Sequence, residues 1–450
     1  VLTPEPALDA AATLLRFLAL GGAWPDSIAV RDATIEVLAD GSRWVMDGLE
    51  VSLNSQKQGR FELQSLIVQS GHLTKVFGPL SAPTVWQEGS ASLAGLEVVP
   101  GITVSELSLH LANGAEPSLS FMARVFGGAL RGDVNLRHGE RGRIWDVAAI
   151  ASNITVDALP ALLDLPGRAT GTLAEGRLTF RGESGRPTDA EASLRVLAKD
   201  FRWNDRGWES LEIGASLIHR RLLVSNFDLR QKDNKVTLNG EISLAEGWAK
   251  IAESPFLMNI RANIKELGSL AGLLGGPLGE ASGQLTAEGS VSGRPGSLDG
   301  FVGIRGTGLS YRSVPVDQMR LELLFRKKKI ELVTCEMRAG QDALDAKGEV
   351  DLAAPHQYSA ELTASLTELA TYLALFREKG LGGVSGGALA IRWKGAGAAG
   401  AHSGAFDLEL SRFVSSLTPA GLTGQFVGTY SPKNIYFSKL EMENAKMRLR

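Results

Sequence analysis

Apolar and polar residues alternate along much of the chain in segments of strand length. Residues 177–181 read Arg-Leu-Thr-Phe-Arg, and residues 211–217 read Leu-Glu-Ile-Gly-Ala-Ser-Leu. The segment 344–352 keeps the same period of two along its whole length. A period of two with one apolar side is typical of antiparallel strands that face water on one side only. The pattern therefore predicts a mainly β protein.

Short helical patterns interrupt the strands. In these segments apolar residues recur at spacings of three and four, and a Ser-Gly or Thr-Gly pair follows, which is a typical helix stop signal. The predicted helical segments are 156–163, 265–274 and 368–379, and the pairs are at 170–171, 282–283 and 385–386.

The chain also resembles itself at an offset of 108 residues. The segment around Gly240 (Val-Thr-Leu-Asn-Gly-Glu-Ile-Ser-Leu) is similar to the one around Gly348 (Leu-Asp-Ala-Lys-Gly-Glu-Val-Asp-Leu), 108 positions later. The Gly-Arg-Pro turn at 185–187 recurs at 293–295, and Gly132 lies 108 positions before Gly240. Several landmarks that share one offset indicate a repeat architecture.

We therefore expect a mainly β fold: an elongated, curved antiparallel sheet that forms a repeating, taco-like β-groove, with short helices punctuating repeats of about 108 residues. The chain begins at Val1 and stops at Arg450 within an apparent strand, so we expect an internal piece of a longer protein. The expected organisation is an N-terminal helical segment at 1–22, the first β-groove units at 23–152, repeat units at 153–262 and 263–364, and a truncated partial unit at 365–450.

Composition narrows the function classes. The chain has 450 residues with 47 basic and 50 acidic side chains, and this balance disfavours a nucleic-acid binder. Cys335 is the only cysteine, which excludes an intramolecular disulfide and a thiolate metal cluster. No apolar run reaches the length of about 18 residues that crosses a bilayer.

Two glycine-rich strings match catalytic or cofactor motifs but lie in the wrong context. Residues 383–387 fit the nucleophile elbow of serine hydrolases around Ser385, yet a helical pattern precedes them and a strand pattern follows. Residues 395–400 fit a dinucleotide-binding string, but the next segment alternates as a strand and offers no helix N-terminus. The six histidines show no metal-ligand spacing. We expect no catalytic site, no cofactor and no metal.

A sheet with one apolar face must cover that face, either against itself or against something that is not protein. The first choice gives a closed array, and the second gives an apolar trough. The candidate lining residues share one strand parity within each segment. They are Leu178, Phe180, Leu211, Ile213, Leu217, Val236, Leu238, Ile242, Leu244, Leu321, Leu323, Phe325, Leu344, Val350, Leu352, Ile391, Leu408 and Leu410.

The order of elements resembles the AsmA-like proteins of Gram-negative bacteria, the family of TamB- and YhdP-type periplasmic proteins. The residues that carry the likeness are the helix and Ser/Thr-Gly pairs, the Gly-Arg-Pro turns, and an opening at 20–37 that reads like the first β-unit of this family. The resemblance implies a periplasmic protein with an inner-membrane anchor outside this chain. It also implies a bridge-like β-groove that moves phospholipid toward the outer membrane.

The function expected from the resemblance is therefore non-enzymatic lipid transport and outer-membrane biogenesis. Its partners would be phospholipid, the membrane and other envelope proteins, with no nucleic acid. The alternative from the residues themselves is a structural β-repeat, such as an adhesin or a surface array, with a closed apolar core. A glycan-binding β-repeat is disfavoured because aromatic residues make up only 6% of the chain.

Overall fold

The protein is mainly β, as predicted. In the part of the chain that the computed structural model describes, 27 antiparallel strands form an open sheet, with few and short helices. The described residues are 26–449 except 40–41, 71–72, 88, 111–115, 140–142, 163, 165, 184–188, 205, 245–247, 275–279, 313, 373–383, 399–400, 416–420 and 445–446. The helical segment expected at 1–22 lies outside them.

The chain divides into two compact units, Val1–Asn226 and Phe227–Arg450, called unit 1 and unit 2 below. The boundary falls within strand β14 (Arg221–Gln231). Each unit is described by itself.

The described residues of unit 1 form thirteen complete strands and one short helix, α2 (Leu159–Leu162). Each strand pairs with the next along the chain, except that β3 pairs with β2, β4 and β5. Its strands are β1 (Ser27–Ala39), β2 (Ser42–Asn54), β3 (Gln58–Ser70), β4 (Leu73–Phe77), β5 (Leu80–Gln87), β6 (Ser90–Val99), β7 (Ile102–His110), β8 (Ser118–Val125), β9 (Gly128–His138), β10 (Arg143–Thr155), β11 (Ala169–Glu183), β12 (Glu191–Trp203) and β13 (Arg206–Ile218).

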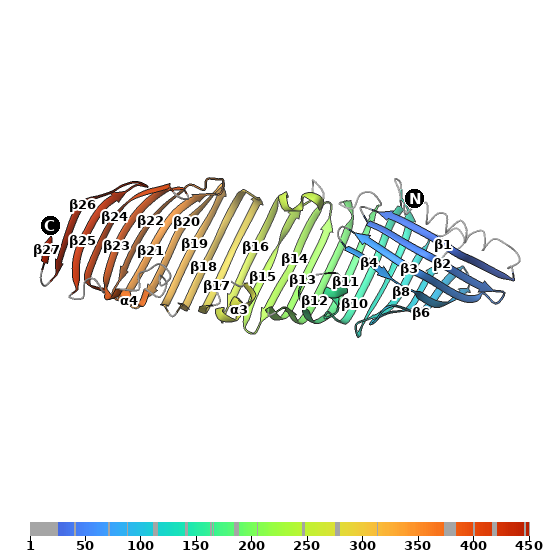
Figure 1. Ribbon diagram of the computed structural model, residues 1–450. Coiled ribbons are helices and arrows are strands. Elements are labelled where there is room, and N and C mark those ends of the chain that lie inside the picture. The colour runs from blue at the N-terminus through green and yellow to red at the C-terminus, as the bar shows by residue number, and fades with distance from the viewer. Residues whose placement is uncertain are drawn as a thin grey trace. The chain divides into compact units, whose positions relative to one another are not determined.

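Unit 2 holds thirteen further strands, which follow one another in chain order (Figure 1). Its strands are β15 (Asn234–Ser243), β16 (Phe256–Ile264), β17 (Ala281–Arg294), β18 (Ser297–Tyr311), β19 (Val314–Lys327), β20 (Lys329–Ala339), β21 (Asp342–Asp351), β22 (Tyr358–Leu366), β23 (Val384–Ala398), β24 (Ala401–Ser415), β25 (Leu422–Tyr430), β26 (Ile435–Asn444) and β27 (Met447–Leu449). Its helices are the 3-10 helix η2 (Trp248–Glu253), α3 (Leu267–Leu274) and α4 (Leu369–Tyr372).

The predicted helices are found, and α2 and α3 begin a few residues later than predicted. Helices α2, α3 and α4 lie within the segments 156–163, 265–274 and 368–379, of which the last is described only to residue 372. The glycine near each following strand start has a positive φ: +123° at Gly171, +107° at Gly283 and +115° at Gly387. At each of these glycines the register of the sheet shifts. These glycines therefore form β-bulges where each new group of strands begins.

Buried residues are distributed unevenly within unit 1. Its strands β2, β3, β5, β6 and β7 pack into a cluster in which Leu63, Leu80 and Ala82 are only 2–5% exposed. A second cluster contains Ala123, Val125 and Ile154. A salt bridge of 2.5 Å from Lys75 in β4 to Asp164, just after α2, joins segments far apart in the chain. In this part of unit 1 the sheet covers its apolar face with itself.

Candidate functional site

Strand register in unit 2 arranges apolar residues in rows that cross the sheet. Directly paired residues of antiparallel strands point to the same face, so each row lies on one side. One row is Leu238, Ile260, Gly289, Val302, Leu323, Leu332, Gly348, Ala360, Gly395, Gly404 and Tyr430. The next is Val236, Ala262, Ala287, Ile304, Leu321, Cys335, Ala346, Leu362, Trp393, Phe406, Gly428 and Phe437. A third is Ile264, Leu285, Gly306, Met319, Met337, Leu344, Ala364, Ile391, Leu408, Phe426 and Leu440.

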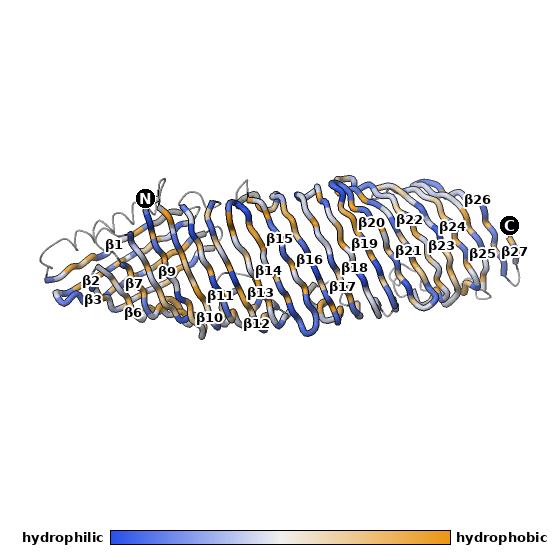
Figure 2. Tube along the Cα trace, turned by 180° about the vertical axis from the view of Figure 1, so that it is seen from behind, coloured by the Kyte–Doolittle hydropathy of each residue, from blue (hydrophilic) through white to orange (hydrophobic). Residues whose placement is uncertain are grey.

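These rows contain no charged residue, and we call the surface that they form the apolar face. Figure 2 shows the corresponding alternation of hydrophobic and hydrophilic positions along the strands. The indole N–H of Trp393 donates to the hydroxyl of Tyr430 at 3.0 Å, so one of the few polar groups on the face already has a partner. Burial, followed by the charge of Asp345, raises the pKa of the Cys335 thiol above its ordinary value. The face thus offers hydrocarbon and almost no hydrogen-bonding capacity.

Little of the described chain covers this face. In unit 2 the strands make their main contacts with their neighbours in sequence, and the helices add contacts of α3 with β17 and of α4 with β23. No described strand packs across the face. Side chains such as Leu238, Leu323 and Leu362 are half-buried, shielded by their neighbours in the sheet rather than by a second layer. Contiguous uncovered apolar surface is uncommon in soluble domains and marks binding sites.

The opposite surface of unit 2, the polar face, is charged and internally paired. Glu361 on β22 contacts the ammonium groups of Lys347 at 2.8 Å and Lys394 at 2.7 Å. Hydrogen bonds and charge from these two lysines lower the pKa of Glu361 to about 2. Lys328 alone separates β19 from β20, and Lys329, the first residue of β20, pairs with Glu349 at 3.0 Å. The sheet is therefore strongly two-sided.

Most of the candidate lining residues in unit 2 share the apolar face. The register places Val236, Leu238, Ile242, Leu321, Leu323, Phe325, Leu344, Val350, Ile391, Leu408 and Leu410 there. Leu244 and Leu352 lie just beyond the ends of β15 and β21, and Leu244 is fully buried.

The five candidates in unit 1 also share a face with one another. Leu178 and Phe180 on β11 pair with Leu194 and Ala192 on β12, and β12 pairs in turn with Leu211, Ile213 and Leu217 on β13. Their burial differs widely, since Leu178 is 39% exposed and Leu217 only 4%.

Sequence reasoning missed two polar anchors in unit 2. Asn234, at the start of β15, is 2% exposed, and its side-chain oxygen accepts from the backbone N–H groups of Lys265 (2.7 Å) and Glu266 (3.0 Å), just before α3. Asp342, at the start of β21, accepts from the backbone N–H of Thr367 at 2.6 Å and from the hydroxyl of Tyr372 at 2.5 Å. The two anchors are 108 residues apart, so the repeat offset was the signal that could have found them.

The two glycine-rich strings that match a nucleophile elbow and a dinucleotide-binding motif lie in or beside strand β23. Ser385 is the second residue of β23, and its hydroxyl donates to the carbonyl of Val414 at 3.4 Å. A strand follows this serine, so the string does not form a strand-to-helix elbow. Gly395 and Gly397 lie within β23, which pairs with β24 rather than leading into a helix.

Within the described part of the chain, no group of three or more His, Cys, Asp or Glu is arranged to hold a metal ion. None of the described helices is long and apolar enough to span a membrane. Comparison with family models, with curated proteins and with solved structures gave no match for this chain.

Proposed function

We propose that this protein is a non-enzymatic lipid-transport protein whose apolar face shelters phospholipid acyl chains. The observation that carries the proposal is the run of charge-free rows across β15–β26, with no described strand packed over them. The likeness to AsmA-like proteins supports a periplasmic location, an inner-membrane anchor beyond this chain and a role in outer-membrane biogenesis.

The chemistry of the face favours hydrocarbon over a protein partner. Protein interfaces carry about one hydrogen bond per 100–200 Å², whereas the three rows offer scarcely any free donor or acceptor. Acyl chains need none. The dimensions also fit, because strands of 10 and 11 residues such as β21 and β20 span about 33 Å at about 3.3 Å per residue. One leaflet of a bilayer has a hydrocarbon depth of only about 15 Å.

Uniformity of the face suits transport rather than fixed binding. Each buried methylene contributes about 0.8 kcal/mol, so a lipid is retained on the sheet. Neighbouring strands lie about 4.8 Å apart, and each contributes similar apolar residues to the rows. A lipid that moves by one strand therefore exchanges one set of contacts for a nearly equivalent set. Small steps between equivalent positions keep the barrier to sliding low.

The alternative function, a structural β-array with a closed apolar core, is favoured by one region. In β2–β7 the apolar face is packed against itself, with Leu63 and Leu80 at 3% and 5% exposure. A chain with such packing throughout would have no path for lipid. Unit 2 is therefore where the two functions are distinguished.

The test places a charge on the apolar face. We expect the wild-type protein, purified from membranes, to carry phospholipid that mass spectrometry detects. Leu238→Asp and Leu323→Asp should remain folded, because a carboxylate on an uncovered face reaches water, but both should lose the lipid. Asn239→Asp is the matched control, since Asn239 on β15 pairs with Asn259 on β16 on the polar face and its side-chain oxygen accepts from the Asn259 amide at 2.9 Å.

Two results would overturn the proposal in favour of the closed array. The first is a wild-type protein without lipid. The second is unfolding of both leucine variants while Asn239→Asp keeps its melting temperature, because an unpaired charge is tolerated poorly only in a closed core.

A further inference from the structure

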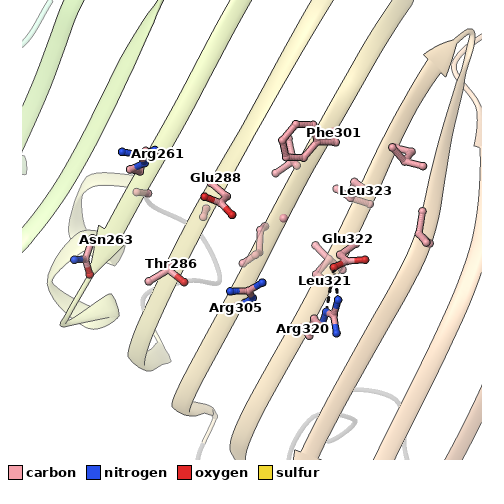
Figure 3. Close-up of a pocket in the computed structure, with 17 residues that line it drawn as sticks. Arg261, Asn263, Thr286, Glu288, Phe301, Arg305, Arg320, Leu321, Glu322 and Leu323 are labelled. Carbon is pink, nitrogen blue, oxygen red and sulfur yellow. Dashed lines mark hydrogen bonds and ion pairs between the residues drawn. The ribbon is translucent and has the colours of Figure 1, made fainter.

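A hollow of about 460 Å³ lies among the charged residues of the polar face of unit 2, over strands β16 to β20. Figure 3 shows its side chains, which include Arg261, Arg305 and Phe301. The charged residues that line the hollow belong to the polar face, and the lining also includes Val302, Ile304, Leu321 and Leu323 of the apolar rows. Its volume lies in the range of about 300–1,000 Å³ that is typical of small-molecule sites.

The hollow exists because Gly303 has no side chain where its neighbours have long ones. Strand register places Gly303 between Glu288 on β17 and Glu322 on β19, with Phe301 and Arg305 two residues away on its own strand. A Cβ at Gly303 would meet only the Glu288 carbonyl oxygen, at 3.8 Å. The space is therefore open, and a side chain can be introduced into it without displacing the backbone.

Positive charge around the hollow is only partly compensated. Arg320 donates to Glu322 at 2.7 Å, and this hydrogen bond raises the pKa of Arg320 above its ordinary value. Within the described residues neither Arg261 nor Arg305 forms an ion pair, although most other charges on this face do. Glu288 is the remaining carboxylate, so three arginines face two glutamates. The two uncommitted guanidinium groups come from strands about 10 Å apart, and both line the hollow.

An apolar wall adjoins these arginines. Phe301 is 51% exposed on the polar face, and it pairs with Leu324 on β19. Val333, at 39% exposure, also lines the hollow. An exposed phenyl ring beside uncommitted guanidinium groups suits a ligand that has both an anionic and an apolar part.

We propose that this hollow binds an organic phosphate, with the phosphate oxygens held by Arg261 and Arg305 and the apolar part against Phe301. Guanidinium groups present several N–H donors in a planar fork that matches phosphate oxygens. The hydroxyl of Thr286, on the strand between the two arginines, provides a further donor for the same anion.

Phenyl phosphate is the probe, with inorganic phosphate and phenol as the partial ligands, and affinity is measured by titration calorimetry on the whole chain. We expect phenyl phosphate to bind about tenfold more tightly than inorganic phosphate, and phenol not to bind. Arg305→Gln and Gly303→Leu should each weaken phenyl phosphate at least tenfold. Phe301→Ser should weaken phenyl phosphate but leave inorganic phosphate unchanged, which separates the apolar contact from the ionic one.

Arg392→Gln is the control, because Arg392 is an exposed arginine on the polar face, on β23, outside the hollow. An equal loss in Arg392→Gln and Arg305→Gln would show unspecific attraction to basic residues and overturn the proposal. Absence of saturable binding to wild-type protein would overturn it as well. Equal affinity for inorganic and phenyl phosphate would reject the organic ligand in favour of free phosphate. Lipid content, measured on the same samples, reports independently on the apolar face.

Discussion

The two ends of the chain use the same alternating pattern for different purposes. In β2–β7 of unit 1, here called the closed region, apolar residues pack against one another and become nearly inaccessible. In β15–β26 of unit 2, the open region, most residues at equivalent parity remain half-buried with no described strand above them, although Ile264, Cys335 and Ala364 are buried. Both outcomes that the alternation allowed therefore occur in one protein.

The difference arises from pairing rather than from hydrophobicity. In the closed region β3 pairs with both β4 and β5 on one side, which splits the sheet and lets its strands pack over each other. Lys75 on β4 then reaches Asp164 and the carbonyl of Ala161 beside α2. In the open region each strand has one neighbour on either side, so no strand is available to fold over the face. An apolar face is thus closed by a branch in strand pairing.

Truncation of one leucine in each region should give the largest difference between them. Leu63→Ala should reduce the free energy of unfolding by about 3 kcal/mol, because Leu63 is fully packed and the truncation leaves a cavity. Leu323→Ala should cost about 1 kcal/mol, since its side chain already borders open space and leaves no enclosed void. Urea unfolding of both variants provides the measurement. Equal losses would mean that unit 2 is as closed as β2–β7.

If the open region lacks a core, its helices must be held by other interactions, and the buried anchors provide them. Asp342→Ala should destabilise unit 2 by about 2 kcal/mol, because the N–H of Thr367 and the hydroxyl of Tyr372 lose their acceptor. Asp342→Asn should cost less, since Asn234 holds α3 with the same kind of amide group. Thermal melting at neutral pH measures both losses.

Acid should weaken the two anchors differently. Burial tends to raise the pKa of Asp342, but hydrogen bonds from Thr367 and Tyr372 outweigh it and hold the pKa below its ordinary value. A carboxyl with a lowered pKa in the folded state stabilises the protein above its unfolded pKa, about 3.9, and loses this contribution as pH falls through the folded pKa. The melting temperature of wild-type protein should therefore fall more steeply below pH 4 than that of Asp342→Asn. Parallel acid profiles would contradict this role.

Sequence alone predicted the fold class well because strand alternation is local. The mainly β architecture and the positions of α2, α3 and α4 follow from periods of two and of three to four, and glycine supplies the bulges at Gly171, Gly283 and Gly387. The start of the helix predicted at 156–163 was placed too early, because α2 begins at Leu159. Pro160 lies at the second position of this helix, and proline is tolerated only in the first turn of a helix.

Alternation could not show how the strands pair. The pairing of the strands decides where the apolar face is covered. Nothing in the residues of β3 indicates that it pairs with two strands on one side. Strands rich in glycine, such as β17, gave too weak a pattern for Val291 or Leu285 to be chosen as lining residues. The hollow around Gly303 depends on register across five strands, which no single segment reveals.

Two glycines of unit 2 provide the smallest test of how the open region is stabilised. Gly348 belongs to the 108-residue repeat, and a Cβ there would approach the carbonyl oxygen of Ser359 on the paired strand to 2.5 Å. Gly348→Ala should therefore force a backbone shift in the ladder between β21 and β22 and cost about 1.5 kcal/mol. Gly303 has space for a Cβ and an ordinary φ, so Gly303→Ala should be neutral or raise stability by about 0.5 kcal/mol through lower entropy of the unfolded chain. Both alanines lie in strands of the same sheet, and only the approach of the neighbouring backbone differs. Urea unfolding distinguishes the two, and similar losses at both positions would show that the intrinsic strand preference of alanine, rather than this contact in the ladder, determines the effect.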